Sequence, residues 1–293
     1  LSILIPTFNR DCTNLVHTLK MQAEKISGLH YEVLVADDAS TLNEVKVANR
    51  SIRQWEGCQL VELESNIGRA RIRNFLAQQA KHPYLLFLDS DVQLVSPNYL
   101  RDYLQYDVQP VVYGGVCIQP NEELARHNLR YRYELACEPR FSVEQRRVSP
   151  YQGFRTSNFL VKRDLLLAHP FDERIRHYGY EDVLFGRRLL SAGIPVTHVD
   201  NPVAVDDFEP NDVFLRKTDE GLHTLQSLSD EMCEYTNILV WVRKLQRLHL
   251  SALALCLFRI AQGPIKRNLL GQSPSVNLYN IYRLCTYLGL KKK

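Results

Sequence analysis

The chain has 293 residues, of which 45% are hydrophobic, 24% charged and 10% aromatic, and its net charge is +3. These proportions are those of a globular protein with ample core, and they exclude disordered, collagen-like and low-complexity chains. Seven cysteines, without CxxC or CxxH spacing, argue against a zinc site or a disulfide framework and favour a reducing, cytoplasmic compartment.

The first 90 residues alternate between strand and helix patterns. Apolar runs predict strands at 1–5, 31–36, 58–63 and 83–88, the first of them ended by Pro6. Amphipathic segments between them predict helices at 12–24, 42–55 and 68–80. This alternation is typical of an α/β fold with a mostly parallel sheet and helices on both faces.

Polar side chains follow three of these strands at the point where each ends. They are Thr7 with Asn9, Asp37 with Asp38, and Asp89 with Asp91. Ligands of parallel α/β sheets bind beyond the carboxyl ends of the strands, so the sequence predicts a ligand site at this edge.

The strongest local signal is Asp89-Ser90-Asp91 after a buried strand. Two carboxylates this close repel each other unless a cation lies beside them. A hard divalent ion shared with substrate phosphates is a natural partner. The alternative is a solvated turn, in which Asp and Ser are simply good turn residues.

A second signal is the helix start at Gly68, whose first turns carry Arg69, Arg71 and Arg73. Backbone N–H groups and the helix dipole favour an anion there, and cations are otherwise unfavourable. The alternative is a solvated basic face.

A third signal is Tyr178-Gly-Tyr-Glu-Asp182, which precedes an expected helix at 183–192. This aromatic, glycine-containing segment suits a sugar-stacking platform, and the alternative is that its two acids are plain helix caps.

These motifs resemble the family 2 glycosyltransferases, the inverting group with the GT-A (Rossmann-like) fold that includes many bacterial surface-polysaccharide enzymes. The matching pieces occur in the family's order: Ser2–Arg10, Val33–Ser40, Asn66-x-Gly68 with Arg73-Asn74, Asp89-Ser-Asp91 and Gly179–Asp182. The resemblance implies a metal-dependent transfer of sugar from a nucleotide-sugar, a UDP-sugar in the first instance. The acceptor is then a hydroxyl of a glycan or lipid-linked carrier in surface polysaccharide or glycoconjugate synthesis.

The resemblance also implies residue roles. Pro6, Thr7 and Asp38 line the nucleoside pocket, Asp38 or Asp37 accepts from the uracil imide, and Arg73 lies near the base or diphosphate. The implied donor site further includes Asn9, Gly68, Asp89 and Ser90.

On the acceptor side, Asp182 is implied as the general base, with Glu181 and Tyr180 positioning the acceptor. Asp91 and Asp89 are implied to hold Mn²⁺ or Mg²⁺. Many relatives place a histidine where this chain has Val205. Asp206 and Asp207 follow at once and could reach the metal or the acceptor instead, so the third protein ligand of the metal stays open, whereas His198 is expected to be structural.

The charge is unevenly divided. Residues 1–215 carry a net −4 and residues 216–293 a net +7, with ten basic and no acidic residues after Glu234. We therefore expect a catalytic domain over 1–215, with a nucleotide-sugar half (1–100) and an acceptor half (101–215), and a basic helical segment over 216–293. Sugar and acceptor selection is expected in a loop region over 114–152.

The helices of the C-terminal segment are expected to break at Pro264 and over 271–274, and to resume at 277–290. No apolar run reaches the roughly 18 residues of a membrane span. The segment suits peripheral contact with the anionic inner face of the plasma membrane, or packing on the catalytic domain as an appendage. No nucleic-acid-binding module is recognised, so no nucleic acid partner is expected.

Two other functions remain open from the sequence. One is a degenerate member that binds nucleotide-sugar without turnover, which the missing histidine keeps open. The other is a sugar-1-phosphate nucleotidyltransferase, although Pro6–Arg10 is not the glycine-rich phosphate loop that such an enzyme needs after its first strand.

Overall fold

The computed structural model describes residues 1–176, 178–232 and 235–290, and the chain divides into two compact units. The first unit consists of residues 1–117, 140–176 and 181–207. The second holds the described residues among 118–139, 177–180 and 208–293. The terminal lysines 291–293 of the basic segment lie outside the described residues.

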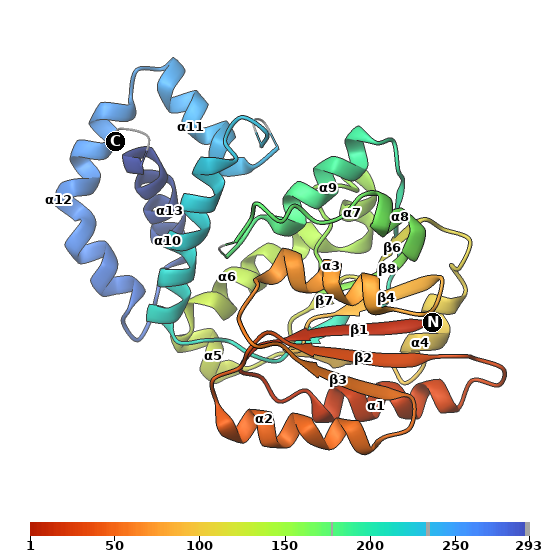
Figure 1. Ribbon diagram of the computed structural model, residues 1–293. Helices are drawn as coiled ribbons and strands as arrows, with labels where there is room; N and C mark the ends of the chain where they lie inside the picture. Colours follow the sequence, from red (N-terminus) through yellow and green to blue (C-terminus); the bar gives the residue numbers. More distant parts are fainter. Residues whose placement is uncertain (177, 233–234, 291–293) are drawn as a thin grey trace. The chain divides into compact units, whose positions relative to one another are not determined.

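The first unit is built on a seven-stranded sheet in the order β3-β2-β1-β4-β8-β6-β9 (Figure 1). Its strands are β1 Ser2–Thr7, β2 Glu32–Asp37, β3 Cys58–Glu62, β4 Tyr84–Leu88, β6 Val111–Tyr113, β8 Asn158–Lys162 and β9 Val196–His198. A three-stranded sheet, β5-β10-β7, consists of β5 Val92–Leu94, β7 Val116–Cys117 and β10 Val203–Val205. In the large sheet β8 runs antiparallel to β4 and β6, and the other neighbours are parallel. The expected mostly parallel sheet is confirmed.

Helices cover both faces of this sheet, so its central strands are buried on both sides. The helical elements of the first unit are α1 Thr13–Glu24, α2 Asn43–Arg50, η1 Ser51–Gln54, α3 Arg69–Gln79, α4 Tyr99–Leu104, α7 Val143–Val148, α8 Arg163–Ala168 and α9 Glu181–Ser191. A short turn of helix, η2 Glu138–Phe141, begins in the second unit and ends in the first.

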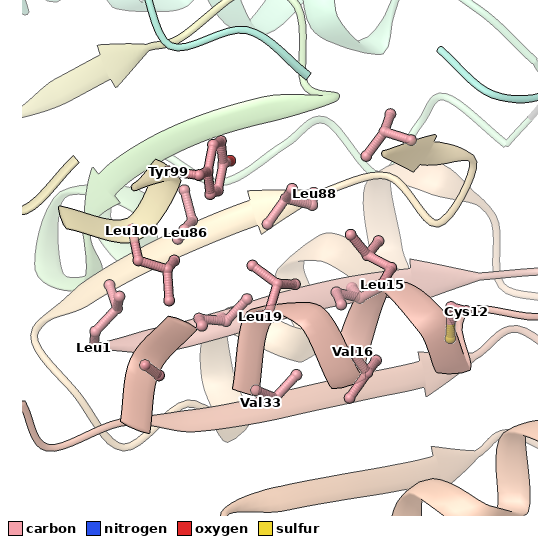
Figure 2. Close-up of a cluster of buried hydrophobic side chains, with 14 of the residues drawn as sticks. Leu1, Cys12, Leu15, Val16, Leu19, Val33, Leu86, Leu88, Tyr99 and Leu100 are labelled. Carbon is pink, nitrogen blue, oxygen red and sulfur yellow. The ribbon is translucent and has the colours of Figure 1, made fainter. Parts of the chain in front are cut away.

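Side chains alternate between two cores along β1. Ile3 and Ile5 belong to one buried cluster, in which Leu15 and Leu19 of α1 point toward the strands (Figure 2). Leu4 faces the other way and joins a second cluster with residues of α3, α8 and α9. This period of two places one layer of helices on each face.

Two boundaries differ from the sequence prediction. Pro6 does not end the first strand but pairs with Ala36 inside β1. It is tolerated because β1 pairs with β4 only as far as Leu4, so no ladder bond is lost on that side. The expected helix 42–55 ends at Arg50 and continues as the tighter turn η1.

The second unit is helical, with α5 Glu122–His127, α6 Leu129–Cys137, α10 Asn211–Ser227, α11 Asn237–Arg247, α12 Ser251–Leu269 and α13 Val276–Leu290. The expected loop over 114–152 is therefore wrong, since it contains β7, α5, α6, η2 and α7. The predicted break at 271–274 is confirmed, but the one at Pro264 is wrong. Ile265 and Leu269 after it are packed in a buried cluster, which offsets the hydrogen bond that proline removes.

Across the described residues, no single helix combines the length and apolar composition needed to cross a membrane. The pair α11 and α12 passes the same criteria only when taken together, and it is bent by 115° at the break between the helices.

Candidate active site

The carboxyl ends of β1 and β2 are joined directly. Thr7 and Asp37 are partners in the parallel ladder, and the Asp38 N–H donates to the Thr7 carbonyl oxygen at 2.9 Å. All three residues are buried. The sheet therefore places these predicted donor-site residues side by side at the expected edge.

Asp38 holds the turn that leads into α3. Its carboxylate accepts hydrogen bonds from the Ile67 N–H at 2.7 Å and the Gly68 N–H at 3.1 Å. Burial raises the pKa of this carboxyl above its ordinary value, and the two N–H donors oppose that rise. Gly68 has a φ of 85°, the left-handed region that favours glycine, and a Cβ there would lie 3.2 Å from the Arg176 carbonyl oxygen.

Asn9 fastens the loop after β1 to the loop after β2. Its side-chain oxygen accepts from the Thr41 N–H at 2.7 Å and the Leu42 N–H at 3.0 Å. Its own N–H donates to the Ser40 hydroxyl at 2.7 Å, while Asp37 accepts from the Ser40 N–H. These contacts fix the backbone of both loops at the edge where β1, whose last residues are Pro6 and Thr7, ends.

Arg73 is the buried cation of the site. Its guanidinium donates to the Asp89 carboxylate at 2.5 Å and to the Arg69 carbonyl oxygen at 3.1 Å. The Glu181 carboxylate lies 3.7 Å away. A solvated basic face, one of the two interpretations of this helix, is wrong for Arg73, whose side chain is 2% exposed, although the Arg71 side chain is 38% exposed.

Glu181 and Asp182 form the first turn of α9, where the helix dipole favours acidic side chains. Glu181 is buried and faces Arg69 at 3.5 Å in addition to Arg73. Burial, and then the charge of Glu181, raise the pKa of Asp182 to about 6, against the opposing charges of Arg155 and Arg73. Asp182 is thus a half-buried carboxyl that titrates just below neutral pH.

The turn after β4 carries Ser90 and Asp91, both half-buried. The Asp91 carbonyl oxygen accepts from the Asp206 N–H at 2.9 Å, which ties this turn to the chain after β10. Asp206 pairs with Arg10 at 2.7 Å, and Asp207 lies 3.7 Å from the same guanidinium. Asp206 is thus hydrogen-bonded to Asp91 through the backbone, and the carboxylates of both Asp206 and Asp207 face the Arg10 guanidinium.

The donor set at this edge fits a divalent ion shared with a substrate. Asp89 has one carboxylate oxygen on Arg73, and Asp91 contributes a second carboxylate two residues on. Among the described residues, no group of three His, Cys, Asp or Glu side chains is placed to hold a metal. Mg²⁺-like ions need only one or two protein carboxylates when substrate phosphates supply the rest, so the chemistry of this pair is compatible with such an ion.

Tyr180 is placed in the second unit, with Tyr178 and Gly179. Its φ of 68° is in the left-handed region. The Tyr178 N–H donates to Glu220, and the Tyr178 carbonyl oxygen accepts from Thr224, both on α10. The backbone of Tyr178, in the segment that precedes α9, is therefore held by hydrogen bonds to α10.

His198 is buried and its Nε2 lies 2.8 Å from the Pro150 carbonyl oxygen. Burial lowers its pKa to about 4, so it stays neutral at physiological pH. Its burial at the end of β9 agrees with the structural role expected from the sequence.

Sequence reasoning missed two features of this region. Arg155, whose charge acts on Asp182, has no motif around it. Asn158 at the start of β8 is fully buried and accepts from the hydroxyls of Tyr99 and Tyr103 at 2.5 and 2.7 Å. Its amide donates to the Gly115 and Asn201 carbonyl oxygens, so one side chain joins four segments that are distant in the sequence.

Comparison with known proteins identifies the family of this chain. Residues 2–167 match the family model "Glycosyl transferase family 2". Validoxylamine A glucosyltransferase of Streptomyces hygroscopicus subsp. limoneus is 30% identical over 67% of this chain and 49% of its own length. Chondroitin synthase of Pasteurella multocida is 26% identical over 72% of this chain and 25% of its own length. The chain thus spans half or less of the length of these relatives.

Solved structures show the fold. A mannosyltransferase, PcManGT, from Pyrobaculum calidifontis, in complex with GDP-Man and Mn²⁺, superposes with a TM-score of 0.57 over 98% of this chain and 84% of its own, at 14% identity. Staphylococcus aureus TarS in complex with UDP gives 0.52 over 99% of this chain and 90% of that chain, at 16% identity. The expected GT-A fold is confirmed, and, with a family model that covers more than half of its length, the chain belongs to glycosyl transferase family 2.

Proposed function

We propose that this edge of the sheet is the active site of a metal-dependent, inverting glycosyltransferase. Its donor is a nucleotide-sugar, a UDP-sugar in the first instance, and its acceptor is a hydroxyl of a glycan or lipid-linked carrier. Relatives such as chondroitin synthase support a role in polysaccharide or glycoconjugate synthesis. Similar folds in complex with UDP, or with GDP-Man and Mn²⁺, support a nucleotide-sugar donor.

The observation that carries the proposal is the environment of Asp182. A general base works best when its pKa lies near the operating pH, and burial beside Glu181 raises the pKa of Asp182 to about 6. Arg73 links Glu181, the neighbour of Asp182, to the end of β4, because it pairs with Asp89 and lies 3.7 Å from the Glu181 carboxylate. The start of α9, which carries the proposed base, and the end of β4, which carries the proposed metal-side carboxylates, thus share one buried cation.

In the proposed reaction, Asp182 takes the proton from the acceptor hydroxyl as the hydroxyl oxygen attacks the anomeric carbon. The bond from that carbon to the diphosphate oxygen breaks in the same step, so the anomeric configuration inverts. Asp89 and Asp91 would hold Mn²⁺ or Mg²⁺, which neutralises charge on the departing diphosphate. Glu181 and Tyr180 are proposed to position the acceptor.

The donor is proposed to lie along the loops that Asn9, Asp37 and Asp38 fix. Asp38 holds the turn at Gly68, at which α3 begins, and the positive end of the helix dipole there favours a diphosphate. Arg73 is engaged with Asp89, so we assign it to orienting that carboxylate beside the donor. The nucleotidyltransferase alternative is wrong, because the chain belongs to a glycosyltransferase family.

Turnover by Asp182→Asn tests the assignment. Hydrolysis of a panel of UDP-sugars by water gives a readout that needs no known acceptor. Loss of the base should lower turnover by about 10²- to 10⁴-fold while donor affinity is retained. Asp164→Asn is the matched control, because Asp164 is an exposed acid in the first turn of α8.

Unchanged turnover in Asp182→Asn would remove Asp182 as the base. A product released with the donor's anomeric configuration would overturn the single displacement. If Asp164→Asn lost turnover as Asp182→Asn does, the loss would be due to the altered charge of the protein and not to removal of a positioned base.

A further inference from the structure

The second unit contains a helix with apolar side chains on two opposite faces. On one face of α12, Phe258, Ile265 and Leu269 are buried in a cluster with α13. α12 lies alongside α13 within this unit (Figure 1). The opposite face carries a stripe of exposed apolar side chains spaced by three or four residues. They are Leu250, Leu253, Leu257 and Ile260, which are 41, 56, 58 and 76% exposed. A water-facing helix side is normally polar, so this stripe suits an apolar partner.

The neighbouring helix α11 also exposes apolar side chains and carries basic residues among them. Trp241 is 53% exposed, with the Lys244 ammonium 4.7 Å from its ring centroid. A surface groove beside it is lined by Val240, Arg243, Lys244, Arg247 and Leu248. We call the exposed stripe of α12, Trp241 and this groove the α11–α12 face.

No acidic side chain balances the charge of the α11–α12 face from its own helices. After Glu234 the sequence has no Asp or Glu, and α13, on which both α11 and α12 pack, has none either. The basic residues of the three helices are Arg243, Lys244, Arg247, Arg259, Lys266, Arg267 and Arg283. Lys244 and Arg247, the exposed cations of the groove, are complementary in charge to an anionic partner.

We propose that the α11–α12 face binds the surface of an anionic lipid bilayer. Exposed leucines beside a tryptophan and clustered cations are the composition of helices that lie in the membrane interface. The leucine stripe would enter the boundary between headgroups and acyl chains, and Arg243, Lys244 and Arg247 would contact lipid phosphates. His249, with a φ of 56°, lies at the break between α11 and α12, where the pair is bent by 115°. Neither of these two helices combines the length and the apolar composition of a membrane span.

Charge also favours lipid over a second copy of this chain. A two-fold contact through the α11–α12 face would place the groove and its three cations against the same residues of the partner. Like charges so placed repel, whereas anionic headgroups attract them. The inference concerns binding alone and does not rest on glycosyl transfer.

Sedimentation with vesicles tests the proposal directly. The chain should bind vesicles of phosphatidylglycerol and phosphatidylcholine in equal parts, and bind phosphatidylcholine alone at least tenfold more weakly. Leu257→Glu/Ile260→Glu should abolish the binding. Val47→Glu on α2 is the control, because Val47 is 59% exposed and Leu257 is 58% exposed. Arg243→Gln/Lys244→Gln/Arg247→Gln should weaken binding by about a hundredfold.

Because all substituted side chains except Arg243 are well exposed, the variants should keep the wild-type circular dichroism spectrum. Failure of the wild-type chain to bind anionic vesicles would overturn the proposal. Equal binding to neutral vesicles would overturn its electrostatic part. A dimer in solution that Leu257→Glu/Ile260→Glu dissociates, without vesicle binding, would assign the face to self-association instead.

Discussion

Arg73 and Asp89 form an ion pair that joins the start of α3 to the end of β4, with a nitrogen–oxygen distance of 2.5 Å. Asp89 follows the central strand β4, and Arg73 is buried beneath the edge of the sheet. Glu181 lies on the other side of the same guanidinium. One cation therefore compensates carboxylates from two separate parts of the site.

Removing this cation should destabilise the protein. Arg73→Met leaves Glu181 buried, and breaking such a pair from one side costs about 3 kcal/mol. Urea unfolding monitored by circular dichroism measures the loss. Arg71→Met is the control, because its contact with Glu173 is 3.6 Å long and exposed, so its effect should stay below about 1 kcal/mol. Equal losses in the two variants would contradict the role of Arg73 as the buried centre of the site.

The pKa of Asp182 predicts how activity and stability depend on pH. Turnover should fall about tenfold per pH unit below about 6, as the base becomes protonated. Because the pKa is raised above the unfolded value of about 3.9, ionisation disfavours the native state, and the free energy of unfolding should fall between about pH 4 and 6. Asp182→Asn should remove that trend and be about 1 kcal/mol more stable at pH 7, since the side chain is partly open to solvent. A turnover profile that is flat from pH 5 to 8 would exclude Asp182 as the titrating base.

His198 should contribute the opposite trend. Its pKa is lowered to about 4 from an unfolded value of about 6.5, so its stabilising contribution is complete above about pH 6.5 and is lost as the pH falls toward 4. His198→Gln should flatten this loss, measured by urea unfolding at about pH 5 and pH 7, without lowering turnover. A large loss of turnover in this variant would show that the histidine serves the site and not only the core.

Gly114 should tolerate no side chain. A Cβ there would overlap the Asn201 carbonyl oxygen and the Tyr103 hydroxyl, both held by Asn158. Gly114→Ala should therefore cost about 3 kcal/mol or more in unfolding free energy. Gly263→Ala in α12 is the matched control: nothing lies within 4 Å of its Cβ position, so the helix should gain about 0.5 to 1 kcal/mol. A mild effect at Gly114 would mean that the loop after β6 can move away.

What could be predicted from the sequence was local. The ends of β2 and β4 follow from apolar runs that stop at Asp37 and Asp89, and the start of α3 follows from Gly68. The family resemblance supplied the fold and the roles assigned to these side chains. Those roles remain predictions that the experiments above address.

What could not be predicted depends on contacts between distant segments. The sequence did not distinguish the burial of Arg73 from that of Arg69 and Arg71, because it depends on contacts with Asp89 and Glu181. Asn158 gave no signal, since its partners Tyr99, Gly115 and Asn201 come from separate segments. Pro264 predicted a break because its local cost is visible in the sequence, whereas the packing of Ile265 that offsets it is not.

Calorimetric titration with UDP, with and without Mn²⁺, tests the central claim most directly. The account predicts micromolar binding of UDP that requires Mn²⁺ and is lost in Asp91→Ala. The control is Asp102→Ala, a substitution in α4 outside the site, which should still bind UDP. Tighter binding of GDP would keep the site and change the donor. Absence of binding by either nucleotide to the folded chain would contradict the assignment of this edge as a donor site.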